Sequence, residues 1–408
     1  MTDEKTNRVK GRLKLSNLKL NTLLEITDAI NSNSSKADLY AILKDVLISE
    51  LYISKFALYI YDTDWHVTLT NGIDKATAAK INLDEVVNQY VNIDVLSSAQ
   101  DKVLKNFDIV IPVYHKKKPL AYLLLADLDG EKIEISPIIK HLRFIQTLAN
   151  IIVVALENKR LNKEYIKQVE VKKELELAQN MQSLLFPRRL PDSKNLKVEA
   201  YYQPHNEVGG DYYDVIQLDE NRTALCVADV SGKGFSAALL MANFQANLRA
   251  IIKLEDNLVD LIKATNQKVI ESANYEKFIT LFICIFDAKE KELRYLNAGH
   301  QPGVLLKKDG TRELKKGCTV LGMFDELPSI QTESLSIEKG DKLICFTDGL
   351  TELELDGNQL GIEGIMPLID RKNEISVIVN HIKEKVKSLK SASSIEDDIT
   401  LLLAEFLP

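Results

Sequence analysis

The sequence contains little cysteine and no block of basic residues, and each absence narrows the range of functions. Only four cysteines occur in 408 residues, and three of them lie within apolar runs: Cys226, Cys284, Cys318 and Cys345. They are predicted to be reduced core residues rather than disulfide partners or zinc ligands. Acidic residues outnumber basic ones by 59 to 52, which gives a net charge of −7. Because nucleic-acid recognition needs a face rich in Lys and Arg, no nucleic-acid partner is expected.

Long hydrophobic runs are also missing. The longest apolar stretch, residues 144–156, is too short and too polar to span a bilayer, so no membrane partner is expected. The first 15 residues carry charges without the apolar core of a secretory signal, which predicts a cytoplasmic protein. A nucleotide-binding P-loop is excluded as well, because Gly234 follows Lys233 where that motif requires Ser or Thr.

The residues that are present divide the chain into three parts. Residues 1–155 combine predicted helices with strands near 55–62 and on both sides of a polar turn at 115–119, which is typical of a small α+β sensor or dimerisation domain. Residues 156–191 begin with a stretch rich in Glu, Lys, Gln and Leu that has neither glycine nor proline, which predicts a long exposed linker helix. Residues 192–408 form the largest part.

The apolar stripe of the linker changes phase near Val169. Leu161, Tyr165 and Val169 lie four residues apart, whereas Val171 starts a roughly heptad spacing that continues to Leu185. This pattern fits a short coiled coil with a stutter, a helix that packs on different partners before and after the break, or a merely amphipathic connector. In the functional interpretation, the linker is a dimeric signalling helix.

The largest part contains clustered strand-like runs with helical patterns grouped between them. This order predicts antiparallel sheets covered by helices rather than a βαβ repeat. Acidic residues mark the ends of four runs: Asp229 and Asp348 follow buried runs, while Asp211 and the pair Asp397 and Asp398 precede others. In an antiparallel sheet the start of one strand lies beside the end of its neighbour, so these carboxylates are expected at one edge.

Carboxylates gathered at one edge repel one another unless cations neutralise them. Mg²⁺ and Mn²⁺ prefer oxygen ligands and keep several waters. Two such ions, about 3.5 to 4 Å apart, lower the pKa of a shared water and clamp a phosphoryl group for in-line attack. The sequence shows no evident Ser-His-Asp or Cys-His arrangement. Its acids therefore favour hydrolysis of a phosphate ester by an activated water.

Five motifs in the largest part carry a family resemblance. They read EVGGDYYD (207–214), ADVSGKGFSAALLM (228–241), LNAGHQP (296–302), GDKLICFTDGLTE (340–352) and EDDIT (396–400). Their order resembles that of the metal-dependent PPM serine/threonine phosphatases, and within these the bacterial SpoIIE/RsbU-like branch. The segment ELELAQNMQSLLFP (174–187) resembles the helix that leads into that domain, and the order of elements in residues 1–155 resembles a GAF domain.

The resemblance implies an α+β fold, an αββα sandwich of two antiparallel sheets between helix layers, preceded by the GAF-like domain and the helical linker. Two Mn²⁺ or Mg²⁺ ions are expected at one edge of the sandwich. By the resemblance, Asp229 bridges both metals and the backbone carbonyl of Val230 completes one shell. Asp348 and Asp397 bind on the other side, and Asp211 holds metal directly or through water. The catalytic residues implied are Asp229, Asp348 and Asp211.

Three neighbouring residues are less defined by the resemblance. Asp398 stands where the wider family has a polar neighbour, so Asp397 is the preferred ligand of the pair. His300 is interpreted as a structural or hydrogen-bonding residue rather than a general acid. Lys233 either meets the substrate phosphate or is a solvated loop residue. Because no arginine lies in the EVGGD region, the group that holds the phosphate stays open.

The function implied is that of a cytoplasmic, dimeric phosphatase acting on phosphoserine or phosphothreonine of a partner protein, often the anti-sigma-factor antagonist of a partner-switching pathway. The amino-terminal part and the linker are expected to regulate it and to form the homodimer. Two alternatives remain open. One is a signalling scaffold that no longer turns over, and the other is a metal-dependent hydrolase of a small phosphorylated metabolite.

Overall fold

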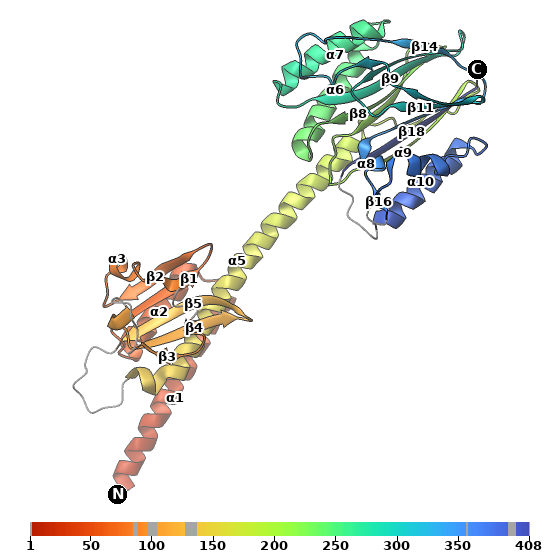
Figure 1. Cartoon of the computed structure of the whole chain (residues 1–408). Coiled ribbons are helices and arrows are strands. Elements are labelled where there is room, and N and C mark those ends of the chain that lie inside the picture. Colours follow the sequence, from red (N-terminus) through yellow and green to blue (C-terminus); the bar gives the residue numbers. More distant parts are fainter. Residues whose placement is uncertain are drawn as a thin grey trace. The chain divides into compact units, whose positions relative to one another are not determined.

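The structure is a computed structural model that describes residues 2–84, 89–96, 104–126, 137–355, 358–390 and 397–407. The chain divides into two units, Met1–Val169 and Glu170–Pro408 (Figure 1). Each unit has its own antiparallel sheet structure and its own hydrophobic core, so the two are described separately.

The first unit is built on one antiparallel sheet in the order β2-β1-β5-β4-β3. Its strands are β1 (Lys55–Tyr61), β2 (Trp65–Asn71), β3 (Asp94–Val95), β4 (Ile109–His115) and β5 (Lys118–Ala126). Its helices are α1 (Thr2–Asn31), α2 (Lys36–Asp45), α3 (Lys75–Ala78) and the first part of α5 (Pro137–Ser183), with single short turns at Val46–Glu50 and Leu104–Asn106. The predicted α+β arrangement is confirmed, while the likeness to a GAF domain stays a prediction.

Alternation along the strands buries both faces of this sheet. On β4, Ile109 and Ile111 pack with residues of α1, α2 and α5, whereas Val110 packs with Ala78 of α3 in a second cluster. The predicted hairpin is present, with β4 and β5 joined at His115 and Lys118. Strand β2 was not predicted, because it is an edge strand whose side chains are mostly half-buried and show no clear apolar alternation.

Helix α5 is uninterrupted over 47 residues, so the predicted linker helix continues the helix that closes the first unit. A stretch of it is long and apolar enough to cross a membrane by length and composition alone. Phe144, Leu148 and Ile152 in this stretch are buried in the core of the first unit, which accounts for its apolar composition. The limits proposed from the sequence at 155 and 191 stay predictions.

The second unit contains two sheets. The first has the order β13-β10-β9-β8-β7, with β14 also pairing with β10, and is antiparallel except for the short β13. Its strands are β7 (Tyr212–Gln217), β8 (Arg222–Val230), β9 (Ile279–Asp287), β10 (Glu292–Ala298), β13 (Gly317–Cys318) and β14 (Glu333–Ser336). The second sheet is antiparallel throughout, in the order β12-β11-β15-β18-β6. Its strands are β6 (Leu196–Gln203), β11 (Gly303–Lys307), β12 (Gly310–Leu314), β15 (Lys342–Phe346) and β18 (Ile399–Phe406).

Helices cover the outer face of each sheet, which confirms the predicted αββα sandwich (Figure 1). The helices are α6 (Phe235–Ile251), α7 (Leu258–Ala273), α8 (Asp348–Thr351), α9 (Gly361–Ile365) and α10 (Ile375–Lys390), with a short turn at Met366–Leu368 and a small hairpin of β16 (Glu354–Leu355) and β17 (Asn358–Gln359). On β8, Cys226 packs toward α6 and α7, whereas Leu225 and Val227 pack between the sheets. Successive side chains of a strand point to opposite faces of its sheet. The core therefore has one layer between the two sheets and one layer beneath the helices on each outer face.

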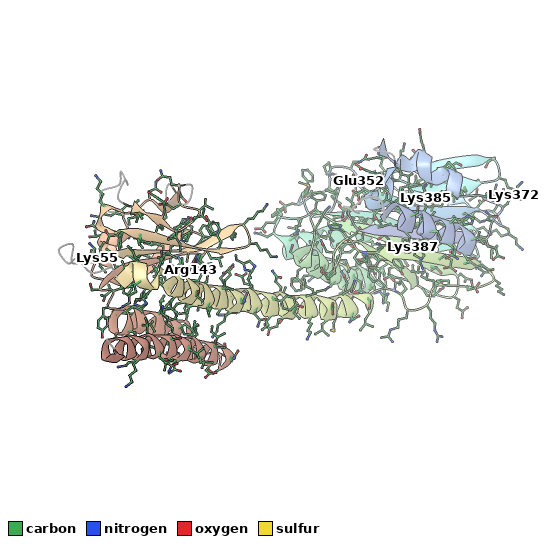
Figure 2. All side chains as sticks on the ribbon, turned by 90° about the horizontal axis from the view of Figure 1, so that it is seen from below. Lys55, Arg143, Glu352, Lys372, Lys385 and Lys387 are labelled. Carbon is green, nitrogen blue, oxygen red and sulfur yellow. The ribbon has the colours of Figure 1, made fainter. Side chains whose placement is uncertain are left out.

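Helix α10 shows how the outer layers are attached. Ile378, Ile382 and Val386 recur at four-residue steps and are buried against the second sheet. Lys387, labelled in Figure 2, pairs instead with Glu384 on the exposed side at 2.9 Å. The four cysteines are all free and three of them are buried, as predicted.

An ion pair between a half-buried arginine and a buried carboxylate fixes α6 to β7. Asp214 on β7 is fully buried, and Arg249 on α6 donates from Nε to its Oδ2 at 2.6 Å and from Nη2 to its Oδ1 at 2.8 Å. The hydroxyl of Tyr212 also donates to this carboxylate. A paired charge of this kind is tolerated inside a core, whereas an unpaired one is costly.

Arg249→Met is therefore expected to lower the free energy of unfolding by about 2 to 4 kcal/mol, because the buried Asp214 carboxylate loses its countercharge. Urea unfolding of the second unit measures the loss. Arg222→Met is the matched control, since Arg222 pairs with Asp219 and with Asp256, whose side chain is 84% exposed, and it should cost less than about 1 kcal/mol. Equal losses in the two variants would contradict the assignment.

Candidate metal and active site

Aspartates from both sheets meet at one edge of the sandwich. Asp229 lies near the end of β8, and Asp211 directly precedes β7, whose Tyr212 pairs with Ala228, so these two acids stand opposite each other. Asp348 follows β15 by two residues, and Asp397 and Asp398 precede β18, the strand paired with β15. The acids predicted at four strand ends therefore form two neighbouring groups, one on β7 and β8 and one on β15 and β18.

Asp211 joins the two sheets. It is 2% exposed, and its Oδ2 accepts hydrogen bonds from Thr347 Oγ1 at 2.7 Å and from Thr400 Oγ1 at 2.6 Å. Burial raises the pKa of Asp211 well above its ordinary value, and the charges of Asp229 and Asp398 raise it further. The two hydroxyls oppose this shift, because they stabilise the ionised form. They also orient the carboxylate.

Burial and mutual repulsion raise the pKa values of acids at this edge. Burial raises the pKa of Asp229 to about 7, with further contributions from Asp348, Asp397 and Asp398. Burial and the neighbouring Asp397 likewise raise the pKa of Asp348. Each of these carboxyls is harder to ionise because the others are charged. A bound cation would reverse that effect.

The adjacent acids Asp397 and Asp398 have different environments. Asp398 is 8% exposed and accepts backbone hydrogen bonds from His205 at 2.8 Å and Gly210 at 2.6 Å, so it holds the loop before β7. Asp397 is half-buried and forms an ion pair with Lys233, with Nζ and Oδ2 3.0 Å apart. The partners of Asp398 are backbone amides, which leaves Asp397 as the more accessible carboxylate of the two.

The loop after β8 turns tightly beside these acids. Gly232 and Gly234 have φ of 86° and 76°, a backbone region that favours glycine. A Cβ atom at Gly210 would lie 3.0 Å from the carbonyl oxygen of Val230, so these two backbone segments pass in close contact. Lys277 Nζ donates to the carbonyl oxygen of Ser231 at 2.9 Å and secures the turn.

His300 is part of the scaffold beneath the site. It is 8% exposed, its Nδ1 lies 2.8 Å from Thr280 Oγ1, and Thr280 pairs with Asp229 in the register of β8 and β9. Burial lowers the pKa of His300 to about 4, so the ring is neutral at pH 7. A neutral, hydrogen-bonded ring fits the structural interpretation better than a general acid.

The donor chemistry of this edge fits a hard divalent cation. Among the residues that the structure describes, no three His, Cys, Asp or Glu side chains already stand as a closed metal-ligand set. The carboxylates present are nonetheless oxygen donors, and burial together with neighbouring acids raises the pKa of Asp229 and of Asp348. Mg²⁺ and Mn²⁺ accept such oxygen ligands together with several waters.

Sequence reasoning missed the residues that orient the acids. Thr347 and Thr400 bind Asp211, and Gln182 binds the backbone of Gly209 in the loop before it. Both threonines lie within one or two residues of an acid of the motif series, which is a weak signal for a supporting role. Gln182 has no comparable signal, because its partner is 27 residues away.

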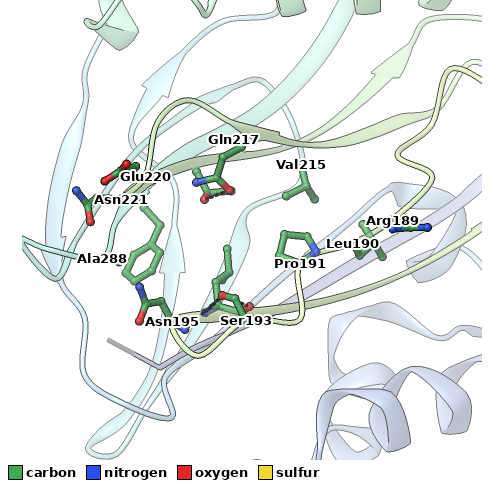
Figure 3. Close-up of a pocket in the computed structure, with 13 residues that line it drawn as sticks. Arg189, Leu190, Pro191, Ser193, Asn195, Val215, Gln217, Glu220, Asn221 and Ala288 are labelled. Atoms are coloured by element: carbon green, nitrogen blue, oxygen red, sulfur yellow. Dashed lines mark hydrogen bonds between the residues drawn. The ribbon is translucent and has the colours of Figure 1, made fainter.

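A separate pocket of about 430 Å³ lies at the opposite end of the strands (Figure 3). It is lined by Gln217 at the end of β7, Thr223 near the start of β8, and Asn195 and Arg189 before β6. Asp229 lies six residues further along β8, roughly 20 Å away at 3.3 Å per residue. The pocket is therefore not part of the acidic edge.

Comparison with known proteins shows which family the second unit resembles. Residues 219–407 match the family model described as Stage II sporulation protein E (SpoIIE). Phosphoserine phosphatase RsbU of Bacillus subtilis is 28% identical over 240 residues, covering 58% of this chain and 71% of RsbU. Phosphoserine phosphatase RsbP of the same organism is 28% identical over 228 residues, covering 53% of this chain and 55% of RsbP. The chain thus spans only part of these relatives.

A solved structure supports the fold. The SiaA-PP2C domain of Pseudomonas aeruginosa aligns with a TM-score of 0.50 and 18% identity, covering 59% of this chain and 98% of that domain. The sandwich has the fold of PP2C phosphatase domains. Residues 219–407 of the second unit are similar to the SpoIIE family.

We expect Asp229→Asn to stabilise the metal-free protein at pH 7. The pKa of Asp229 is raised from 3.8 to about 7, so the folded state holds the proton more tightly than the unfolded state, and stability falls as pH rises from about 4 to 7. Removing the charge should restore about 1 to 3 kcal/mol at pH 7 and nothing near pH 4. Urea unfolding in a chelator checks this, and a gain that does not vary with pH would contradict it.

Proposed function

We propose that this chain is a Mn²⁺- or Mg²⁺-dependent phosphatase that removes phosphate from phosphoserine or phosphothreonine of a partner protein. The observation that carries the proposal is the meeting of uncompensated aspartates from both sheets at one edge of a PP2C-class sandwich. The relatives RsbU and RsbP are phosphoserine phosphatases, which favours a phosphoprotein over other phosphate esters.

Each acid has a proposed role. Asp229 and Asp348 would hold the cations, together with Asp397 and the carbonyl of Val230. Asp211, oriented by Thr347 and Thr400, binds directly or through water. When bound, two such ions supply an activated water and a clamp for the phosphoryl group.

Lys233 is the side-chain cation beside this set, in ion-pair contact with Asp397. Its side chain is 49% exposed and lies on a loop bounded by Gly232 and Gly234. A cation at Asp397 would compete with Lys233 for the carboxylate. In this proposal the displaced ammonium group contacts the substrate phosphate.

The partner proposed is a phosphorylated anti-sigma-factor antagonist of a partner-switching pathway, met in the cytoplasm. A protein substrate suits a site at the edge of a sandwich, where the acids lie at or beside the ends of strands. Regulation is proposed to come from the first unit through α5, which continues without a break into the second unit.

The activity test is manganese-dependent phosphate release by the full chain from a phosphoserine protein and from an aryl phosphate. Asp229→Ala and Asp348→Ala are each expected to reduce the rate at least about 100-fold, because each removes a metal ligand. Asp219→Ala is the matched control, since Asp219 is an exposed acid paired with Arg222 at the other end of β8, and it should retain full activity.

Two outcomes would favour the alternatives. Manganese binding without turnover on any phosphoprotein would favour a signalling scaffold. Faster turnover of nucleotides or sugar phosphates than of phosphoproteins would favour a metabolite phosphatase. Full activity of either the Asp229→Ala or the Asp348→Ala variant would overturn the metal-site assignment.

A homodimer is proposed to form through the first unit and α5. Apolar side chains are exposed along α5, including Leu161 at 46%, Tyr165 at 65% and Val171 at 48%. Leu20 and Leu24 on α1 are also more than half exposed. A second copy of the same helices would cover these side chains, as in a coiled coil.

Tyr165→Glu is expected to shift the chain from dimer to monomer at micromolar concentration, because a charge would enter the apolar seam. Light scattering after size exclusion measures the mass. Lys167→Glu is the control, since it changes a polar residue on the same helix and should leave the dimer intact. A monomeric parent chain, or a dimer unaffected by Tyr165→Glu, would count against this interface.

A further inference from the structure

A pocket of about 320 Å³ lies within the first unit. Its lining comes from α2, the end of β1, the start of β5 and the part of α5 between residues 153 and 163. These elements cover the same face of the five-stranded sheet, on the side of the larger core of this unit. The volume is at the lower end of the range of small-molecule sites, which is about 300 to 1,000 Å³.

Part of the pocket wall is apolar. Tyr40, Leu120 and Val153 line it, and all three are buried members of the core of this unit. Ile60 and Leu156 line it as well and are partly buried against the same core. Apolar walls with a few charged groups are typical of sites that bind small molecules. A ligand in this pocket would therefore place an apolar body against these side chains.

The charged side chains of the lining have an excess of positive charge. Four are cationic and two are acidic: Lys36, Lys159, Arg160 and Lys163 against Asp62 and Glu157. Arg160 is already compensated, because its Nε and Nη2 donate to the two oxygens of Glu157 at 2.9 and 2.8 Å. Its Nη1 also donates to Glu164 at 2.7 Å and lies 3.8 Å from Asp62. The lysines therefore carry the excess charge.

Lys36 and Lys163 are the cations best placed to receive an anion. Neither forms an ion pair with any side chain in the part of the chain that the structure describes. Lys36 Nζ lies 5.7 Å from the centre of the Tyr40 ring, beside the apolar wall. Lys159 differs, since its Nζ donates to the carbonyl oxygens of Asn33 at 3.2 Å and Ser34 at 3.0 Å. Two uncompensated cations from α2 and α5 thus border one pocket.

We propose that this pocket binds a small amphipathic anion. The apolar body of the ligand packs against Tyr40, Leu120 and Val153, and its terminal carboxylate or phosphate group pairs with Lys36 and Lys163. A lysine ammonium is a point charge that accepts either head group, whereas the planar fork of Arg160 is held by Glu157. The site lies entirely in the first unit, so the proposal does not depend on the catalysis proposed for the second.

The chain contains its own reporter for this pocket. Trp65 is the only tryptophan, and its ring centroid lies 5.2 Å from that of Tyr61, which lines the pocket. The full chain is titrated with octanoate and with octyl phosphate below their micelle concentrations, in a chelator so that no metal-dependent hydrolysis occurs. Saturable changes in tryptophan fluorescence and in calorimetric heat are expected. Octan-1-ol, the uncharged analogue, should bind at least about fivefold more weakly than the better anion. The tighter of the two anions identifies the head group.

Charge variants locate the site. Lys36→Gln and Lys163→Gln are each expected to weaken anion binding about two- to fivefold and to leave octan-1-ol unaffected, because each removes one countercharge. Both side chains are exposed, so neither change disturbs the core. Lys167→Gln is the matched control, since Lys167 lies four residues beyond Lys163 on α5 and is not among the lining residues. It should bind like the parent.

Leu156→Phe tests the apolar wall, because the larger ring would occupy the space of the ligand body and should abolish binding of both anions. Absence of saturable binding by both readouts in the parent chain would overturn the proposal. Equal affinity for octan-1-ol and the anions would overturn it too, as would an equal loss of affinity in Lys163→Gln and Lys167→Gln. The lysine variants decide the question if Leu156→Phe does not fold.

Discussion

Repulsion between carboxylates at one sheet edge is the interaction on which the arrangement of the second unit depends. Burial raises the pKa of Asp229 and of Asp348, and the neighbouring charge of Asp397 raises both further. A sheet edge with this charge persists only because strong forces elsewhere fix the strands that carry it. Those forces are the doubly covered strands β8, β9, β15 and β18, whose apolar residues fill the space between the sheets and beneath both helix layers.

Asp214 provides the internal comparison. It is more completely buried than Asp229 and lies only three residues from Asp211, yet it is bonded at both carboxylate oxygens by Arg249. An arginine therefore neutralises a buried acid within this strand. At the edge, Lys233 on a loop pairs with Asp397. The difference in compensation separates an acid that stabilises the fold from the acids that we propose receive a cation.

Much of the fold could be predicted because it depends on local sequence. Continuous apolar runs such as residues 223–230 and the amphipathic pattern of α10 determine their own element type, and the acids beside the strand runs mark one edge. The order of motifs then indicated the family.

What could not be predicted depends on tertiary contacts. The short strands β2, β12, β13 and β14 have weak apolar alternation, since much of their surface is half-buried or exposed. The roles of Thr400 and Asp398 follow from partners about 190 residues away, Asp211 and Gly210, and no pattern along the chain records such pairs.

The contacts at the end of α5 differ in how strongly their energy depends on the position of the helix. Rings such as those of Phe186 and Tyr202, which lie 4.6 Å apart, keep most of their contact when a helix slides by a fraction of an ångström, because dispersion and apolar burial vary slowly with distance. The paired bonds of Gln182 to Gly209 do not, since hydrogen bonds weaken steeply with misalignment. A small movement of α5 would thus leave the aromatic contact intact while breaking the hold on Gly209. The amide pair therefore depends more strongly on the position of α5 than the aromatic contacts do.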